Sequence, residues 1–233
     1  MIRQRRPMMT YTWFNRTPGM ALMTTHLFSP AEKRLPGMTR VPFPTLVVDV
    51  HNEDFVRHWS DSARTKINRA SRESIEIRRG GELLPDILQL FRPTAYLRGL
   101  RGYAETHFDS IPHVECTAAY YEGVMLCGHI WVVDDEERRA VLYVNASSHH
   151  RGQEDSSLYG RAHYYLLWQD GLYLRHIGVG TMDLMGYEPE TTNEWLRGVY
   201  QWKAATHGVR ETLYHYYPAW FYQLRRIRQA LGR

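Results

Sequence analysis

The sequence of 233 residues lacks several signatures of common chemistry. It contains no phosphate-binding P-loop, no Rossmann glycine fingerprint, no HExxH motif and no CxxC pair, so nucleotide, dinucleotide and zinc-protease chemistry have no support. His149 and His150 are adjacent in an expected loop and cannot form a helical i, i+4 ligand pair, so we expect no metal site. No apolar run approaches the roughly 20 residues needed to cross a bilayer, which predicts a protein without a membrane span.

Cysteine is scarce as well. The two cysteines, Cys116 and Cys127, fall in neighbouring expected strands, and we interpret them as buried free thiols in a reducing compartment. The first six residues are basic, but the following Pro7–Thr10 stretch is too polar for a signal-peptide hydrophobic region. These features predict a cytoplasmic protein.

Lysine is rare, since only Lys33, Lys66 and Lys203 occur among 29 basic residues. The formal net charge is +4 and the pI is near 9.1, which favours anionic partners such as a phosphorylated cofactor, nucleic acid or an acidic lipid surface. Hydrophobic residues make up 43% and charged residues 23%, a globular composition. Positive charge concentrates in three segments, residues 64–72, 78–79 and 225–233.

The pattern of strands and helices indicates a mixed α+β fold with a central sheet. Residues 1–44 contain several Pro-Gly and Pro-x-Pro breaks and read as one or two short strands with loops, packed on a domain of residues 45–233. Within that domain we expect strands at 45–50, 75–78, 113–121, 124–133, 139–146, 181–185 and 209–216. Helices are expected at 53–74, 83–108 with breaks near Pro93 and Gly99, 158–176, 193–208 and after Pro218.

The stretch from Gly180 to Gly208 holds two of the expected functional residues. Asp183 lies where a short apolar strand stops, and Gly186 permits a sharp turn after it. Asn193 can cap the next helix, which carries Lys203 just beyond its apolar stripe. Lysine presents a mobile point charge, so its use at this position in an arginine-rich chain indicates a specific role for Lys203. A solvated lysine on the helix flank would fit the same pattern.

The loop before the helix at Leu158 is a candidate anion site, because free amides at a helix N-terminus attract phosphate. Ser156, Ser157 and Gly160 would let a phosphate approach the backbone, and Arg151 or Arg161 would pair with it. A simple capped helix is the alternative interpretation. The tyrosine-rich residues 214–222 can stack on nucleotide bases, but alternation favours core packing.

Taken together, these segments resemble the FemAB-like branch of the GNAT acyltransferase superfamily over residues 45–208. The resemblance rests on the opening strand at 45–50, a basic R-x-x-I-x-x-A helix at 64–70 and the segments 121–124 and 127–130. It continues with Met182-Asp183-Leu184-Met185-Gly186, similar to the family's Y-D-L-G-G strand end, and Gly198 to Lys203, similar to its G-x-x-x-F-K helix. Met185 stands where the family has glycine, and Trp202 where it has phenylalanine.

The resemblance implies a GNAT-like fold and an N-acyltransferase with no tightly bound cofactor, in which an amine attacks an activated acyl group directly. Lys203 would contact the donor's phosphate or the developing negative charge, and Asp183 would orient the amine or accept its proton. Glu122 and His129 are further candidates for the general base, while Tyr143 and Tyr165 are secondary cleft candidates.

Both the donor and the catalytic activity remain open at this point. Acyl-CoA is favoured as the donor substrate, although the GNAT pyrophosphate motif is only partly matched at residues 157–162. An aminoacyl-tRNA-dependent transferase is the alternative, in which the basic helix and the arginine-rich tail would hold RNA; bridge-forming members of that type carry two GNAT-like units, and this chain has room for one. A non-catalytic binding module is the third reading.

Overall fold

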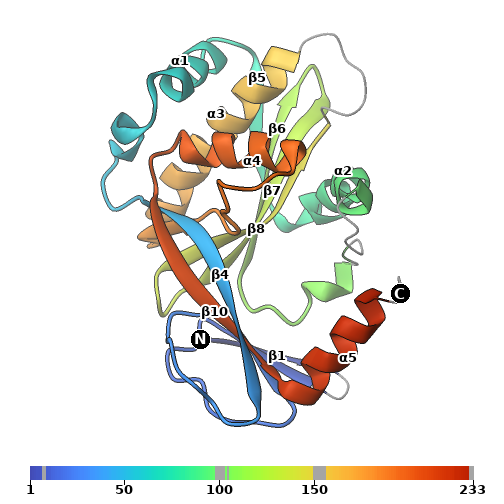
Figure 1. The fold of residues 1–233 in the computed structure, drawn as a ribbon. Helices are drawn as coiled ribbons and strands as arrows, with labels where there is room; N and C mark the ends of the chain where they lie inside the picture. The colour runs from blue at the N-terminus through green and yellow to red at the C-terminus, as the bar shows by residue number, and fades with distance from the viewer. Residues whose placement is uncertain (7–8, 98–102, 104, 149–155, 231–233) are drawn as a thin grey trace. The chain divides into compact units, whose positions relative to one another are not determined.

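The computed structural model of the chain describes residues 1–6, 9–97, 103, 105–148 and 156–230 (Figure 1). These residues form two compact units. The larger comprises Leu46–Val209, and the smaller combines Met1–Thr45 with Arg210–Arg233. The N-terminal segment therefore groups with the last residues of the chain, and the extent of an acyltransferase domain over 45–233 stays a prediction.

The larger unit contains a mixed sheet with the strand order β4-β9-β8-β7-β6-β5. Its neighbouring strands pair antiparallel except for β8 and β9, which run parallel. The α+β class expected from the sequence is confirmed. The strands are the end of β4 (Met38–Asp49), β5 (Ile75–Arg79), β6 (Val114–Tyr121), β7 (Val124–Asp134), β8 (Arg139–Ser147) and β9 (Thr181–Asp183).

Helices cover both faces of this sheet (Figure 1). The α-helices are α1 (Asp61–Ala70), α2 (Leu84–Leu97), α3 (Ser156–His176) and α4 (Glu194–Ala204), with short 3-10 helices η1 (Phe55–His58), η2 (Gly81–Leu83) and η3 (Glu105–His107). Adjacent residues of β7 point to opposite faces, since a Cβ on Gly128 would meet Ile87 of α2 while His129 bonds to Asp170 of α3. Therefore α2 covers one face, and α3 covers the other.

The expected helix at 53–74 is shorter in the structure, because η1 precedes α1 and Ser60 separates the two helices. The Ser60 hydroxyl accepts a hydrogen bond from the Ala63 amide and so begins α1. The predicted apolar stripe is buried, and its members are Phe55, Trp59, Ala63, Ile67 and Ala70. The stripe thus fixes both short helices against the sheet.

The smaller unit contains more strands than the sequence suggested, so the expectation of one or two was wrong. Its sheet has the strand order β1-β2-β3-β10-β4 and includes the first part of β4. The other strands are β1 (Ile2–Arg6), β2 (Met9–Trp13), β3 (Thr24–Ser29) and β10 (Val209–Pro218), and helix α5 (Ala219–Ala230) follows β10 in the chain. Pro42 and Pro44 lie within β4 instead of ending it. Aromatic packing outweighs the proline signal here, since Phe28 contacts the rings of Trp13, Phe43 and His215.

Of the remaining predictions from the sequence, some are confirmed and others are wrong. Pro93 lies inside α2 and does not break it, whereas Gly99 is outside the described residues. The expected strand at 181–185 ends already at Asp183. Cys116 and Cys127 are free and buried, as predicted. Across the described parts of the chain, no helix combines the length and apolar character that a bilayer crossing requires.

The smaller unit should lose stability in mild acid because of His215. This buried ring accepts a hydrogen bond from the Phe28 amide at Nδ1, and burial, aided by the positive charge of Arg225, lowers its pKa to about 4. Below the usual His pKa of about 6.5, the unfolded chain therefore binds a proton that the native state does not. We expect the unfolding free energy to fall by about 2 kcal/mol more between pH 7 and 5 in the wild type than in His215→Asn, measured by urea denaturation. The exposed His176→Asn serves as control, and equal pH dependence in all three proteins would contradict this account.

Two glycines of α3 give a matched packing test. A Cβ on Gly171 would lie 2.4 Å from Cζ of the buried Phe55, whereas a Cβ on Gly160 would meet nothing within 4 Å. We expect Gly171→Ala to lower the unfolding free energy by about 1–3 kcal/mol through overpacking. Gly160→Ala should change it by less than about 1 kcal/mol, in the stabilising direction, because alanine favours the helix. Urea denaturation of both variants measures the difference, and a Gly171→Ala protein as stable as the wild type would refute the packing argument.

Candidate functional site

Strands β8 and β9 separate at the point where the sequence places Asp183. The two parallel strands pair over three positions, Arg139 with Thr181, Ala140 with Met182, and Val141 with Asp183. Among the strand pairings of the described residues, β9 accompanies β8 no further, while β8 continues to Ser147. The sheet therefore opens after Asp183, and the chain turns away there.

Asp183 is buried and holds the turn that follows it. Its Oδ2 lies 2.6 Å from Nη2 of Arg139, and its Oδ1 accepts a hydrogen bond of 2.8 Å from the Met185 amide. Met185 has a φ of 57°, a left-handed conformation that favours glycine. A glycine would adopt this conformation without steric cost. We call residues 183–186 the Met185 turn.

Lys203 reaches the same turn from α4. Its Nζ donates to the carbonyl oxygens of Met185 and Gly186, each at 2.8 Å, and the side chain is only 8% exposed. The Asn193 side chain caps α4 through the Leu196 amide at 3.2 Å, as the sequence predicted, and so sets the register that carries Lys203 to the turn. The structure thus brings Asp183 and Lys203 to one residue, because Asp183 binds the N–H of Met185 and Lys203 binds its carbonyl.

His129 lies in a second buried polar group, at the interface of β7 and α3. Its Nδ1 is 2.7 Å from Oδ2 of Asp170, which also accepts the indole N–H of Trp131 at 2.9 Å. Because Nδ1 donates to the carboxylate, Nε2 would be an acceptor in a neutral ring, and no described residue bonds to it. Asp170 was not among the residues predicted from the sequence. Its signal was an acid among the buried α3 residues Leu166, Leu167 and Leu174, where an unpaired carboxylate would be costly.

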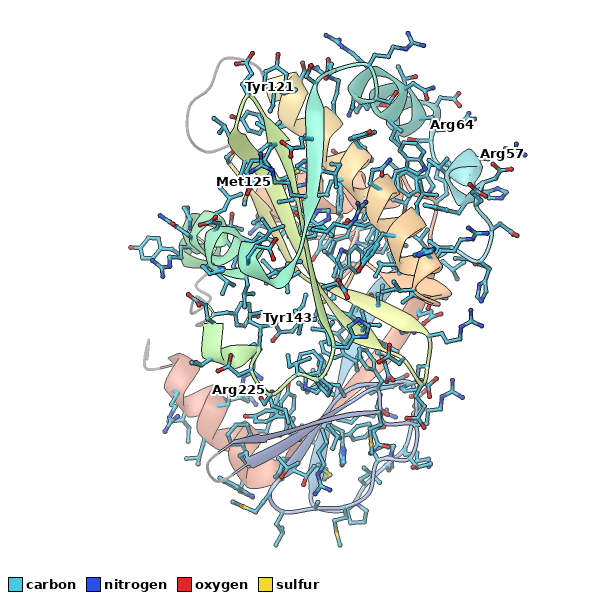
Figure 2. The ribbon with its side chains drawn as sticks, turned by 180° about the vertical axis from the view of Figure 1, so that it is seen from behind. Arg57, Arg64, Tyr121, Met125, Tyr143 and Arg225 are labelled. Carbon is cyan, nitrogen blue, oxygen red and sulfur yellow. The ribbon has the colours of Figure 1, made fainter. Side chains whose placement is uncertain are left out.

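Glu122 lies far from these groups. It occupies the two-residue turn between β6 and β7, where Glu122 and Gly123 have φ values of 50° and 77°, and it is exposed. The 11 residues of β7 place this turn about 33 Å from the other end of the strand, near which Asp183 pairs with β8. Figure 2 shows neighbouring Tyr121 at this hairpin end, so Glu122 does not join the Met185 turn.

Of the residues expected to bind phosphate, Ser157, Gly160 and Arg161 are described, and they lie in the first two turns of α3. Arg151 lies outside the described residues, as does the side chain of Ser156. Arg161 is buried and forms two contacts of 2.9 Å with the Glu73 carboxylate, and it also bonds to the Ser157 hydroxyl. Gly160 leaves open space beside the helix. Binding of a phosphate by these residues stays a prediction.

The two tyrosines named as secondary cleft candidates pack against other rings. The Tyr143 hydroxyl is 3.0 Å from Nε2 of His107, and its ring stacks on His107 and contacts Tyr103 and Phe108 (Figure 2). Tyr165 is half-buried against Trp168, with ring centroids 5.8 Å apart. Both placements fit the packing alternative.

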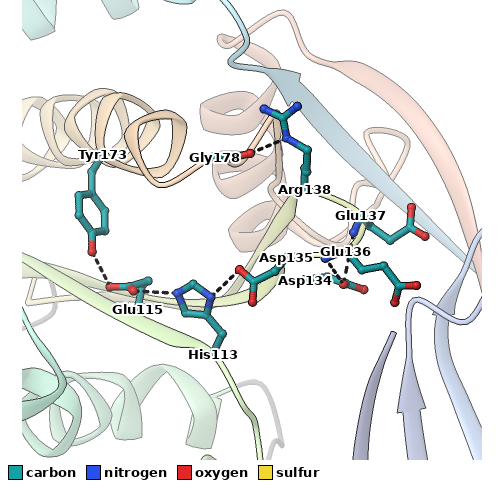
Figure 3. Close-up of polar contacts among 9 residues, drawn as sticks. All are labelled: His113, Glu115, Asp134, Asp135, Glu136, Glu137, Arg138, Tyr173 and Gly178. Atoms are coloured by element: carbon teal, nitrogen blue, oxygen red, sulfur yellow. Dashed lines mark hydrogen bonds and ion pairs between the residues drawn. The ribbon is translucent and has the colours of Figure 1, made fainter.

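A third polar cluster joins β6 to the end of β7 (Figure 3). His113 lies between two carboxylates, with Nε2 2.9 Å from Glu115 and Nδ1 2.8 Å from Asp135, and Tyr173 donates to Glu115 at 3.0 Å. Burial alone would lower the pKa of His113, but the hydrogen bonds to Glu115 and Asp135 outweigh it and raise the pKa. The His113 ring therefore joins β6 to the β7–β8 hairpin. Within the described ranges, no group of three His, Cys, Asp or Glu residues is arranged to hold a metal ion.

Substitutions at Met185 test whether the turn is strained. Met185→Gly removes the cost of a left-handed methionine but adds chain entropy, so we expect a change in unfolding free energy within about 1 kcal/mol. Met185→Val places a β-branched residue at the same φ and should destabilise by about 2 kcal/mol or more relative to Met185→Gly. Urea denaturation measures both. Equal stability of the two variants would show that the conformation of residue 185 is not constrained.

No family model and no curated protein matches the sequence. Solved structures are nevertheless similar. FemX matches with a TM-score of 0.60 and 12% identity, covering 82% of this chain and 64% of that one. The C-terminal domain (DUF2156) of a putative lysylphosphatidylglycerol synthetase from Agrobacterium fabrum matches at 0.56 and 13%, covering 83% and 67%. The structure of L-PGS from Bacillus licheniformis matches at 0.52 and 12%, covering 78% and 62%.

These similarities concern the fold. The chain spans 64% of the length of FemX and 62% of that of L-PGS, at identities that carry no conclusion about substrates. The FemAB-like resemblance drawn from the sequence is confirmed at the level of the fold, because FemX and the lysylphosphatidylglycerol synthetase domain match with TM-scores of 0.60 and 0.56. The chain has the fold shared by FemX and the lysylphosphatidylglycerol synthetase domain.

Proposed function

We propose that the protein is an N-acyltransferase that moves an acyl or aminoacyl group from an activated donor to an amine. The observation that supports this most strongly is the separation of the parallel strands β8 and β9 at Asp183, where Lys203 of α4 meets the same turn. Among the described strand pairings β9 no longer accompanies β8 beyond Val141, and an extended donor could enter the sheet there. Asp183 and Lys203 place ionisable side chains beside this opening.

In the proposed reaction the amine nitrogen attacks the acyl carbonyl carbon, forming a C–N bond and a tetrahedral oxyanion. The oxyanion collapses, the bond to the donor sulfur or oxygen breaks, and the proton lost by the amine ends on the leaving group or in solvent. No covalent enzyme intermediate is formed. The protein contributes orientation and electrostatic stabilisation, each of which can supply several kcal/mol.

The contacts suggest different roles for the two ionisable residues. The Lys203 ammonium places a positive charge beside the Met185 turn, where it would stabilise the donor's phosphate or the oxyanion. Asp183 is already bonded to Arg139 and to the Met185 amide, so we assign it the positioning of the turn and of the acceptor. His129 offers an acceptor nitrogen, but it is buried under α3, and Glu122 is exposed at a distant hairpin, so neither is proposed as the base.

Acyl-CoA is the first donor to test. The open space beside Gly160 would allow a pyrophosphate to approach the first turn of α3, where free amides attract anions. The aminoacyl-tRNA alternative is favoured by a different observation, since two similar folds are those of FemX and of a putative lysylphosphatidylglycerol synthetase, whose name implies lysyl transfer. On α1, however, Arg64 and Arg69 are paired with Asp61 and Glu73, which reduces the charge left for RNA.

Lys203→Ala tests the proposal. We expect transfer to fall by about 100-fold or more, because a charge placed at a developing oxyanion commonly contributes at that scale. Release of free CoA from an acyl-CoA panel with primary-amine acceptors is followed with a thiol reagent, and transfer from charged tRNA is followed with a labelled amino acid. Burial raises the pKa of Cys116 to about 12, and Cys127 is likewise buried, so the native protein should add little thiol background.

The exposed Lys33→Ala is the charge-matched control and should retain activity. Circular dichroism and urea denaturation must show that Lys203→Ala still folds, and Lys203→Arg keeps the charge while altering its reach. A folded Lys203→Ala protein with wild-type transfer would refute the role of Lys203. Calorimetric binding of a donor with no turnover of any donor would instead identify a non-catalytic binding module.

A further inference from the structure

The net positive charge of the protein comes from the smaller unit. Its 69 residues, Met1–Thr45 and Arg210–Arg233, contain twelve arginines and lysines against two acids, Glu32 and Glu211, which gives a formal charge of +10. Because the whole chain has +4, the larger unit has a formal charge of −6. An excess of this size within one unit predicts an anionic partner for that unit.

Helix α5 displays an apolar stripe to solvent in this basic unit. Trp220, Leu224 and Ile227 are 40%, 49% and 54% exposed, and their spacing of four and three residues places them on one helix face. The Tyr222 side of the helix packs inward, since the Tyr222 ring lies 5.8 Å from the Tyr217 ring, and Arg225 donates to the Tyr217 hydroxyl at 3.1 Å. The apolar stripe is therefore a surface feature, separate from the side of α5 that packs against the rest of the unit.

A loop lengthens this apolar surface at the Trp220 end of α5. Met20, Leu22 and Met23 are exposed, and the Trp220 indole donates to the Leu22 carbonyl at 2.9 Å. The Thr10 amide anchors the loop by donating to the Met23 carbonyl at 2.8 Å. We call the set the α5 surface, and its members are Met20, Leu22, Met23, Trp220, Leu224 and Ile227.

Exposed arginines lie on the same helix as this stripe. At 100° per residue, Arg228 lies about 40° from Leu224 and adjoins the stripe, whereas Arg226 lies about 100° from Ile227, beyond Gln223. Apolar residues including tryptophan, on a helix whose polar face is basic, are typical of helices that lie in the headgroup layer of a bilayer. We propose that the α5 surface docks the protein on an anionic lipid bilayer, with Arg226 and Arg228 contacting headgroup phosphates.

RNA fits these observations less well than lipid. Single-stranded RNA is held by basic residues together with aromatic rings that stack on bases. Five of the six members of the α5 surface are aliphatic or methionine side chains, which cannot stack, and Trp220 is fixed through its indole N–H. Leu, Ile and Met gain free energy from burial in acyl chains, and the arginines gain from anionic headgroups. This proposal does not depend on the transfer chemistry.

Sedimentation with vesicles tests the proposal on the full chain. Vesicles of phosphatidylcholine with 30 mol% phosphatidylglycerol should bind the protein, and pure phosphatidylcholine should bind it about tenfold or more weakly. The double variant Leu224→Gln/Ile227→Gln should reduce binding to anionic vesicles by about tenfold or more. Arg226→Gln/Arg228→Gln should reduce it comparably and weaken its dependence on salt.

Val209→Gln is the control, because Val209 is exposed and apolar but belongs to the larger unit. It should bind vesicles as the wild type does. Equal binding to neutral and anionic vesicles, or wild-type binding by the Leu224→Gln/Ile227→Gln protein, would overturn the proposal. So would tRNA binding without vesicle binding, or a concentration-dependent dimer that these substitutions abolish in the absence of any vesicle binding.

Discussion

The candidate site depends on the backbone of Met185, whose N–H and C=O are both bound by ionisable side chains. A left-handed methionine costs on the order of 1–2 kcal/mol and persists only where its surroundings hold it in place. Asp183 binds its N–H and Lys203 its carbonyl, while Arg139 fixes Asp183 from β8. One turn therefore couples β8, β9 and α4 at the position where the two parallel strands part, and the side chains that would serve catalysis are the ones that shape the backbone there.

The buried ionisable groups of the larger unit belong to different faces of the sheet. Met182 packs in the same core cluster as Trp131, and Trp131 shares the Asp170 carboxylate with His129. Side chains alternate along a strand, so Asp183 points away from the face that holds His129. A buried charge requires a partner, and here each carboxylate has one on its own face. The fold thus keeps the Asp183 pair and the Asp170 pair apart, and only the former adjoins the opening of the sheet.

Sequence patterns predicted what depends on neighbours along the chain. Strands β6 to β8, the Asn193 cap and the buried stripe from Phe55 to Ala70 follow from local periodicity and turn residues. The partners Arg139 and Asp170 could not be predicted, because they lie 44 and 41 residues from the side chains they bind. The number of strands in residues 1–44 was underestimated for a similar reason. Their aromatic core includes His215 from the far end of the chain, and that packing outweighs the prolines.

The distribution of net charge between the two units is a further property that cannot be seen in the linear sequence. A net charge of +4 on 233 residues is a weak signal, yet it is the difference between a unit of +10 and a unit of −6. Both ends of the chain contribute to the basic unit, so no continuous window of sequence reveals it. Opposite charges on the two units favour different partners for each, and an anionic surface would attract the smaller unit while repelling the larger one. Such a division orients the protein before any specific contact forms, because electrostatic attraction acts over about 10 Å at moderate salt.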